Sequence, residues 1–187
     1  MKIKLMLLPF ILFVTVVFAN PPIQKRVLVY TKNGKGFVHT NIANSVESLK
    51  KIGILNNLIV DVSEDPSVMT SEKLAKYNCL VFSNTNNEIF ETEEQRRAFV
   101  SYIHNGGAFV GIHIASGSER NWPWFHEMIG GLFKRHPAFQ SFEIKVIDKN
   151  HPSTVMLPEI WKKEDECYFM TELNPNCHVL LAADLRT

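Results

Sequence analysis

Short apolar segments recur along the first two thirds of the chain and alternate with longer segments of mixed polarity. The apolar runs 26–30, 58–60, 79–83 and 108–112 are rich in aliphatic and aromatic residues. Continuous runs of this length are typical of strands that are buried on both faces, as in a parallel sheet. We therefore predict a strand at each of these positions.

Two amphipathic helices are predicted between these strands. The first covers residues 41–51 and stops before Gly53, because apolar positions recur there at helical spacing. The second runs from Thr92 to about His104. Thr92 and Gln95 have the spacing of a capping box, and a glycine pair follows the helix.

This β-α-β-α-β order predicts an α/β fold, a mostly parallel sheet with helices on both faces. The second half of the chain differs. Phe142, Ile144 and Val146 alternate with mostly polar residues, which predicts a strand at an edge or in a hairpin, and residues 178–182 predict another strand. We expect these as antiparallel additions, and we expect the functional site at the carboxyl ends of the parallel strands.

The first 19 residues have the pattern of a signal peptide. Lys2 and Lys4 precede an uncharged run over residues 5–18, and Ala19 ends a small-residue cleavage pattern. The run is shorter than the roughly 20 residues that a spanning helix needs. We expect cleavage after export, a periplasmic or secreted protein, and no stable membrane span afterwards; an uncleaved anchor is the alternative.

Composition limits the class of protein but indicates no particular chemistry. The chain has 187 residues, with 20 Lys+Arg against 19 Asp+Glu. Without the two lysines of the signal, the balance is 18 minus 19, a net charge of −1. This net charge predicts no basic surface for binding nucleic acid. The length predicts one domain, over residues 24–187. Cys79, Cys167 and Cys177 are too few and too irregular for a disulfide framework, although a Cys167–Cys177 pair stays open.

The stretch most informative about chemistry is Gly111-Ile112-His113-Ile114-Ala115, at the end of the fourth predicted strand. Small residues two before and two after His113 permit a sharp turn that exposes the central side chain, as in a nucleophile elbow. Imidazole can act there as general acid, general base or metal ligand. A histidine that merely ends the strand is the alternative.

From this point the sequence resembles the ThuA-like (trehalose-utilisation) proteins, relatives of the class I glutamine amidotransferases. The resemblance runs in order from about Arg26 to Leu185. It rests on these segments: Gly36-Phe37-Val38-His39, Glu64-Asp65-Pro66, Gly106-Gly107, Gly111-Ile112-His113, Trp122-Pro123-Trp124-Phe125, Ile129-Gly130-Gly131-Leu132-Phe133, His136-Pro137, Asp148, His151-Pro152-Ser153-Thr154 and Asp165-Glu166-Cys167-Tyr168.

The resemblance implies a flavodoxin-like sheet and a role in sugar metabolism, especially of keto-disaccharides. Amidotransferases carry a cysteine where this chain has His113, so we do not expect glutaminase activity. Family members usually continue with further His-Pro, Trp and Gly-His segments. Those are not in this sequence, which leaves open that the domain is truncated at its C-terminus.

Three residues are candidates for catalysis. His39 follows the first strand, so it belongs on the same sheet edge as His113. The resemblance adds Glu166, whose carboxylate would assist the histidines; the alternative is a solvated acidic surface. No pair of histidines has metal-ligand spacing in the sequence, so we assign no metal site and name no cofactor.

Five residues are candidates for substrate binding. His136 is held extended by the following proline. Trp122 and Trp124 offer aromatic faces for a sugar ring, or else form a hydrophobic lid. Asn84 lies in a polar loop after the third strand, and the resemblance adds Tyr168.

We therefore expect an exported protein that acts on a carbohydrate, a keto-sugar or disaccharide derivative, with His113 as acid or base. An isomerase, lyase or hydrolase activity would fit. The alternative is a module of the same fold that binds a sugar or docks a partner without catalysis. Whether the chain forms a homo-oligomer is left open.

Overall fold

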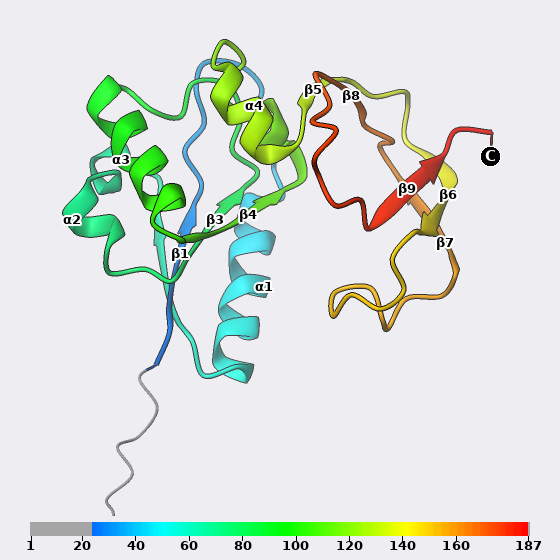
Figure 1. The fold of residues 1–187 in the computed structure, drawn as a ribbon, viewed down its shortest axis with the longest axis horizontal. Coiled ribbons are helices and arrows are strands. Elements are labelled where there is room, and N and C mark those ends of the chain that lie inside the picture. The colour runs from blue at the N-terminus through cyan, green and yellow to red at the C-terminus, as the bar shows by residue number, and fades with distance from the viewer. Residues whose placement is uncertain (1–23, 187) are drawn as a thin grey trace, which may run out of the picture.

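The structure is a computed structural model that describes residues 24–186. The expected signal peptide over residues 1–19 lies outside this range. Within the described part, the first half is an α/β layer and the second half consists of two small antiparallel sheets (Figure 1). No helix between residues 24 and 186 combines the length and the apolar character needed to cross a bilayer.

A parallel sheet of four strands forms the centre of the first half, in the order β2-β1-β3-β4. This order begins like that of flavodoxin-like sheets. The strand bounds match the sequence prediction at three positions, while β2 lies slightly later than expected. The strands are β1 (Arg26–Tyr30), β2 (Ile59–Ser63), β3 (Cys79–Ser83) and β4 (Ala108–Ile112).

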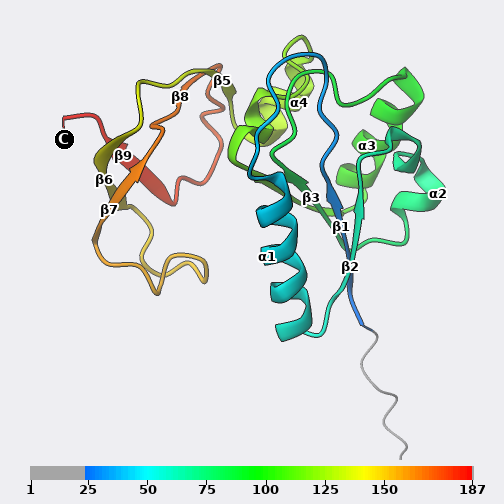
Figure 2. The same ribbon diagram turned by 180° about the vertical axis from the view of Figure 1, so that it is seen from behind.

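Helices cover both faces of this sheet, as predicted. Figures 1 and 2 show α1 (Ile42–Leu55) on one face, opposite α2 (Ser71–Leu74) and α3 (Glu93–His104). The predicted start of α3 is confirmed, since the Thr92 hydroxyl accepts a hydrogen bond from the Gln95 amide at 3.3 Å. A fourth helix, α4 (Pro123–Ile129), follows β4 and packs near α3.

The predicted end of the first helix is wrong. Helix α1 continues through Gly53 to Leu55. A Cβ atom on Gly53 would lie 2.4 Å from Cγ2 of Val60 on β2. The glycine therefore serves close packing of the helix against the sheet rather than helix termination.

The hydrophobic core lies between the sheet and α2, α3 and α4. Phe82 on β3 is fully buried at its centre, and its ring centroid lies 5.3 Å from those of both Tyr30 and Phe99. Phe125 of α4 stacks on it from 6.3 Å. Such aromatic clusters supply large buried areas, so this layer holds α3 and α4 on the sheet.

The second half contains two antiparallel sheets. One pairs β5 (Leu132–Arg135) with β8 (Phe169–Thr171). The other has β6 (Gln140–Val146) between β7 (Ile160–Asp165) and β9 (Leu181–Asp184). Strand β7 is therefore the antiparallel partner expected for β6. Strand β6 itself lies at the centre of this sheet rather than at its edge. The three cysteines are free, so Cys167 and Cys177 do not pair.

We expect Phe82→Ala to lower the free energy of unfolding by about 3–5 kcal/mol, because it opens a cavity at the centre of the aromatic core. Phe139→Ala is the matched control, since Phe139 is 63% exposed, and its effect should stay within about 0.5 kcal/mol. Urea unfolding of both variants measures the difference. Equal losses would contradict this placement of the core.

Candidate active site at the carboxyl edge of the parallel sheet

His113 stands where β4 ends and the short 3-10 helix η2 (His113–Gly117) begins. Its backbone is left-handed, with φ at 57°. A Cβ atom on Gly111 would lie 3.2 Å from Cβ of Ala115, so small residues at these two positions let the chain turn closely. The predicted elbow is confirmed, and it leaves the side chain of His113 about 25% exposed.

Both nitrogens of the His113 ring have partners. Nδ1 lies 3.0 Å from Oδ1 of Asn84, and Nε2 lies 2.8 Å from the hydroxyl of Tyr168. Asn84 directly follows β3, has a left-handed backbone and is buried. The structure therefore places this predicted binding residue behind the imidazole, where its amide holds the ring.

His39 is the second imidazole of the cluster. It comes from the loop between β1 and α1, and its ring centroid lies 4.5 Å from that of His113, edge to face. Burial lowers the pKa of His39, and the neighbouring His113 lowers it further. Its Nδ1 is buried and has no hydrogen-bond partner among the described residues. This environment favours the neutral ring.

Glu166 lies between two histidines. One carboxylate oxygen is 3.6 Å from Nε2 of His113, and the other is 3.8 Å from Nε2 of His136. The hydroxyl of Tyr168 lies 3.5 Å from Glu166. Burial, aided by the charge of Glu166, raises the pKa of Tyr168 well above its usual value, so this phenol keeps its proton at neutral pH.

The antiparallel pairing of β5 and β8 accounts for part of this arrangement. Arg135 at the end of β5 is paired with Phe169 at the start of β8. The next residues, His136 and Tyr168, therefore emerge side by side, with ring centroids 5.7 Å apart. Phe133 of β5 packs against Tyr168 at 4.4 Å, a contact that the sequence analysis missed because no pattern marks it.

The two tryptophans are not part of this cluster. The Trp122 ring lies 5.8 Å from Phe90, and the Trp124 ring lies 6.0 Å from Phe99. The two indoles stack on each other at 5.2 Å. Both contacts are to residues of the hydrophobic core, so the lid alternative describes these side chains better than the sugar-stacking one.

Comparison with known proteins agrees with this architecture. The model of the ThuA family, described as trehalose utilisation, matches residues 26–187. The chain belongs to the ThuA family. No curated protein matches it.

Two solved structures of ThuA-like proteins are similar to this chain. One, from Bacteroides uniformis, has 29% sequence identity and a TM-score of 0.71, over 87% of this chain and 70% of that one. The other, from Parabacteroides merdae, has 21% identity and a TM-score of 0.67, over 86% of this chain and 68% of that one. The second likeness bears on the fold alone.

His39, His113 and Glu166 also have the composition of a zinc-binding set, each offering one donor atom within 4.8 Å of the other two. Ligands of a tetrahedral zinc ion lie roughly 3.3 Å apart, so the cluster would have to contract. The ion would also displace the Tyr168 hydroxyl from Nε2 of His113. As arranged in this ThuA-family protein, the three donor atoms are spaced more widely than the ligands of one tetrahedral ion, and Nε2 of His113 bonds the Tyr168 hydroxyl.

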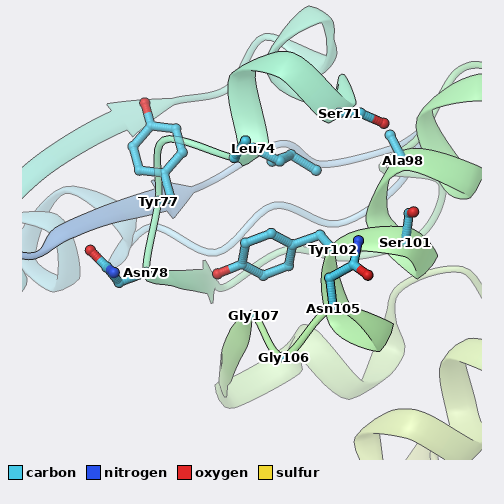
Figure 3. A pocket seen from close by; sticks show the side chains of 11 residues that line it. Ser71, Leu74, Tyr77, Asn78, Ala98, Ser101, Tyr102, Asn105, Gly106 and Gly107 are labelled. Carbon is cyan, nitrogen blue, oxygen red and sulfur yellow. The ribbon is translucent and has the colours of Figure 1, made fainter.

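A separate cavity of about 310 Å³ lies between α2 and α3 (Figure 3). Leu74 and Tyr102 project into it, and Gly107 forms its floor next to β4. It opens at the amino ends of β3 and β4, and its lining has no histidine and no charged side chain. This cavity therefore shares no residue with the cluster around His113.

We expect the stability of the protein to fall as the pH drops below about 6.5, in part because of His39. Its pKa is lowered in the folded state by burial and by His113. The unfolded chain therefore takes up this proton at a higher pH than the folded one. His39→Gln should reduce the loss of stability between pH 7 and pH 5, measured by urea unfolding at each pH.

His104→Gln is the control for this experiment, because His104 ends α3 outside the cluster. A pH profile of His39→Gln that coincides with that of the unmodified protein would contradict the assigned environment of His39.

Proposed function

We propose that this protein acts on a carbohydrate that carries a carbonyl group, a keto-sugar or keto-disaccharide derivative, with His113 as the acid or base. His39 and Glu166 assist it, and Tyr168 and His136 bind the substrate. The family description supports the choice of a sugar. The proposal includes export of the mature protein, as the pattern of residues 1–19 suggests.

One observation carries the catalytic part of the proposal. Nε2 of His113 faces a phenol at 2.8 Å and a carboxylate at 3.6 Å, and the ring is partly exposed. A base must lie within hydrogen-bond reach of the proton it takes, and a donor must stand where negative charge develops. The pair His113 and Tyr168 brings these two functions together.

The reaction begins at the acidic C–H bond beside the carbonyl. When substrate binds, the Tyr168 hydroxyl turns from His113 to the carbonyl oxygen and leaves Nε2 free. The C–H bond breaks and its proton passes to Nε2. The electron pair forms the C=C bond of an enolate, and the carbonyl π pair moves to oxygen, which Tyr168 stabilises.

The protonated His113 then acts as the acid. In an isomerisation the proton of the hydroxyl on the deprotonated carbon passes to the enolate oxygen, and His113 delivers its proton to the former carbonyl carbon, so that the neighbouring oxygen becomes the new carbonyl. In an elimination the bond to the substituent on the next carbon breaks, and the leaving oxygen takes the proton. Glu166 stabilises the imidazolium in both cases because its carboxylate lies beside Nε2. Neutral His39 avoids a second positive charge next to that ring.

The test is to mix the purified protein with 3-keto-glucosides in D2O and to follow ultraviolet absorbance and NMR. We expect deuterium incorporation beside the carbonyl, and product if the reaction goes further. His113→Gln should slow exchange by roughly 10²–10⁴-fold, the range that general acid–base catalysis contributes. Tyr168→Phe should slow it by roughly 10²–10³-fold, as loss of an oxyanion donor does.

His151→Gln is the matched histidine control, since His151 hydrogen-bonds Ser153 within its own turn. Its exchange rate should equal that of the unmodified protein. Unchanged substrate, or an unaffected rate in His113→Gln, would overturn the catalytic proposal. Calorimetric affinity for a sugar without exchange would favour the non-catalytic binding module instead.

A further inference from the structure

A line of buried and part-buried hydrogen bonds runs from His113 toward helix α1. Nδ1 of His113 contacts Oδ1 of Asn84 at 3.0 Å, and Nδ2 of Asn84 contacts Oγ of Ser83 at 3.3 Å. Oγ of Ser83 lies 2.7 Å from Oγ of Ser45 on α1. Asn84 and Ser83 are both buried. Ser45 lies 68 positions before His113 in the chain, and no sequence pattern connects it with the site.

The direction of each bond follows from what each group can donate. The amide NH2 of Asn84 only donates and its oxygen only accepts. With NH2 directed at Ser83, the amide oxygen faces Nδ1 of His113, so that nitrogen must carry a proton. Ser83 accepts from Asn84, and its own hydroxyl proton is then free to donate to Ser45.

We propose that Ser45, Ser83 and Asn84 are positioning residues that fix the ring tautomer of His113, with the proton on Nδ1 and the lone pair on Nε2. The lone pair then accepts the hydrogen bond of the Tyr168 hydroxyl. This deepens the proposed function, because it assigns Nε2 as the nitrogen that exchanges the proton. Its test needs no substrate.

The opposite arrangement is incompatible with a ring that gains and loses a proton. If the NH2 of Asn84 faced His113, Nδ1 would have to be unprotonated. Protonating the ring would then require the buried amide to rotate, and its contact with Ser83 opposes that. With the amide oxygen facing Nδ1, the neutral ring and the imidazolium use the same hydrogen bond, so proton exchange at Nε2 needs no rearrangement.

Ring ¹⁵N shifts of His113, assigned by comparison with His113→Gln, test the proposal at a pH where the ring is neutral. We expect roughly a tenfold excess of the form protonated on Nδ1, the bias that one hydrogen bond supplies. Ser45→Ala should lower this ratio by about threefold. Ser83 then loses its acceptor, and its hydroxyl can donate to Oδ1 of an Asn84 amide that has flipped, which directs the NH2 group at Nδ1 of His113.

Ser48→Ala is the matched control on the same helix, since the Ser48 hydroxyl bonds the Asn44 carbonyl at 2.9 Å. It should leave the ratio unchanged. Asn84→Asp supplies a second test, because a carboxylate accepts from Nδ1 through either oxygen and needs no orientation by Ser83. In that background, Ser45→Ala should no longer shift the ratio.

A His113 ring protonated mainly on Nε2 would overturn the proposal. So would equal effects of Ser45→Ala and Ser48→Ala, or an undiminished effect of Ser45→Ala in the Asn84→Asp background. Failure of the proposed function has a different signature. A protein that exchanges no proton of any keto-sugar but keeps the expected tautomer would lack the activity while retaining the positioning device.

Discussion

The candidate site depends on two non-glycine residues whose backbones are left-handed at the ends of adjacent parallel strands. Asn84 ends β3 with φ at 55°, and His113 ends β4 with φ at 57°. Such conformations cost of order 1–3 kcal/mol each unless the side chain is one that tolerates them, as asparagine and histidine do better than most. The turns direct both side chains to one edge of the sheet, where they bond each other.

This pair organises the remaining groups. His39 reaches His113 because β1 is next to β3 in the sheet, and parallel strands end at the same edge. Burial lowers the pKa of His39, which favours the neutral ring where it lies against His113. The phenol of Tyr168 and the carboxylate of Glu166 approach Nε2 of His113 from the antiparallel half of the chain. The cluster thus combines two imidazoles with a phenol that keeps its proton and a carboxylate.

Much of this arrangement could be predicted from the sequence. The strand positions follow from apolar runs, and the elbow follows from the small residues around His113. No local pattern places Glu166, Tyr168 and His136 at the site, because the pairing of β5 with β8 is a long-range contact. The family resemblance indicates the first two of these residues, and a following proline marks the third. Sequence periodicity also misassigned Gly53, whose role depends on Val60 of a later strand.

Other parts depend on tertiary contacts that no sequence pattern marks. Trp122 and Trp124 have the composition of a sugar platform, yet the nearby aromatic core gives them more favourable burial. Ser45 looks like any polar position on an amphipathic helix. Only the packing of α1 on the sheet brings it to the buried end of β3. Residue type indicated which side chains gather around His113 better than it indicated those that hold its ring.

The candidate site is divided between the parallel sheet and the segment that joins the two antiparallel sheets. His113 and Asn84 belong to the parallel sheet, whereas Tyr168 and Glu166 lie between strands of the antiparallel additions. Substitutions in the antiparallel portion could therefore change the groups around His113 while the elbow and its supporting amide stay intact. In a scaffold of this kind, the imidazole at the strand end is a fixed module and its surroundings are interchangeable.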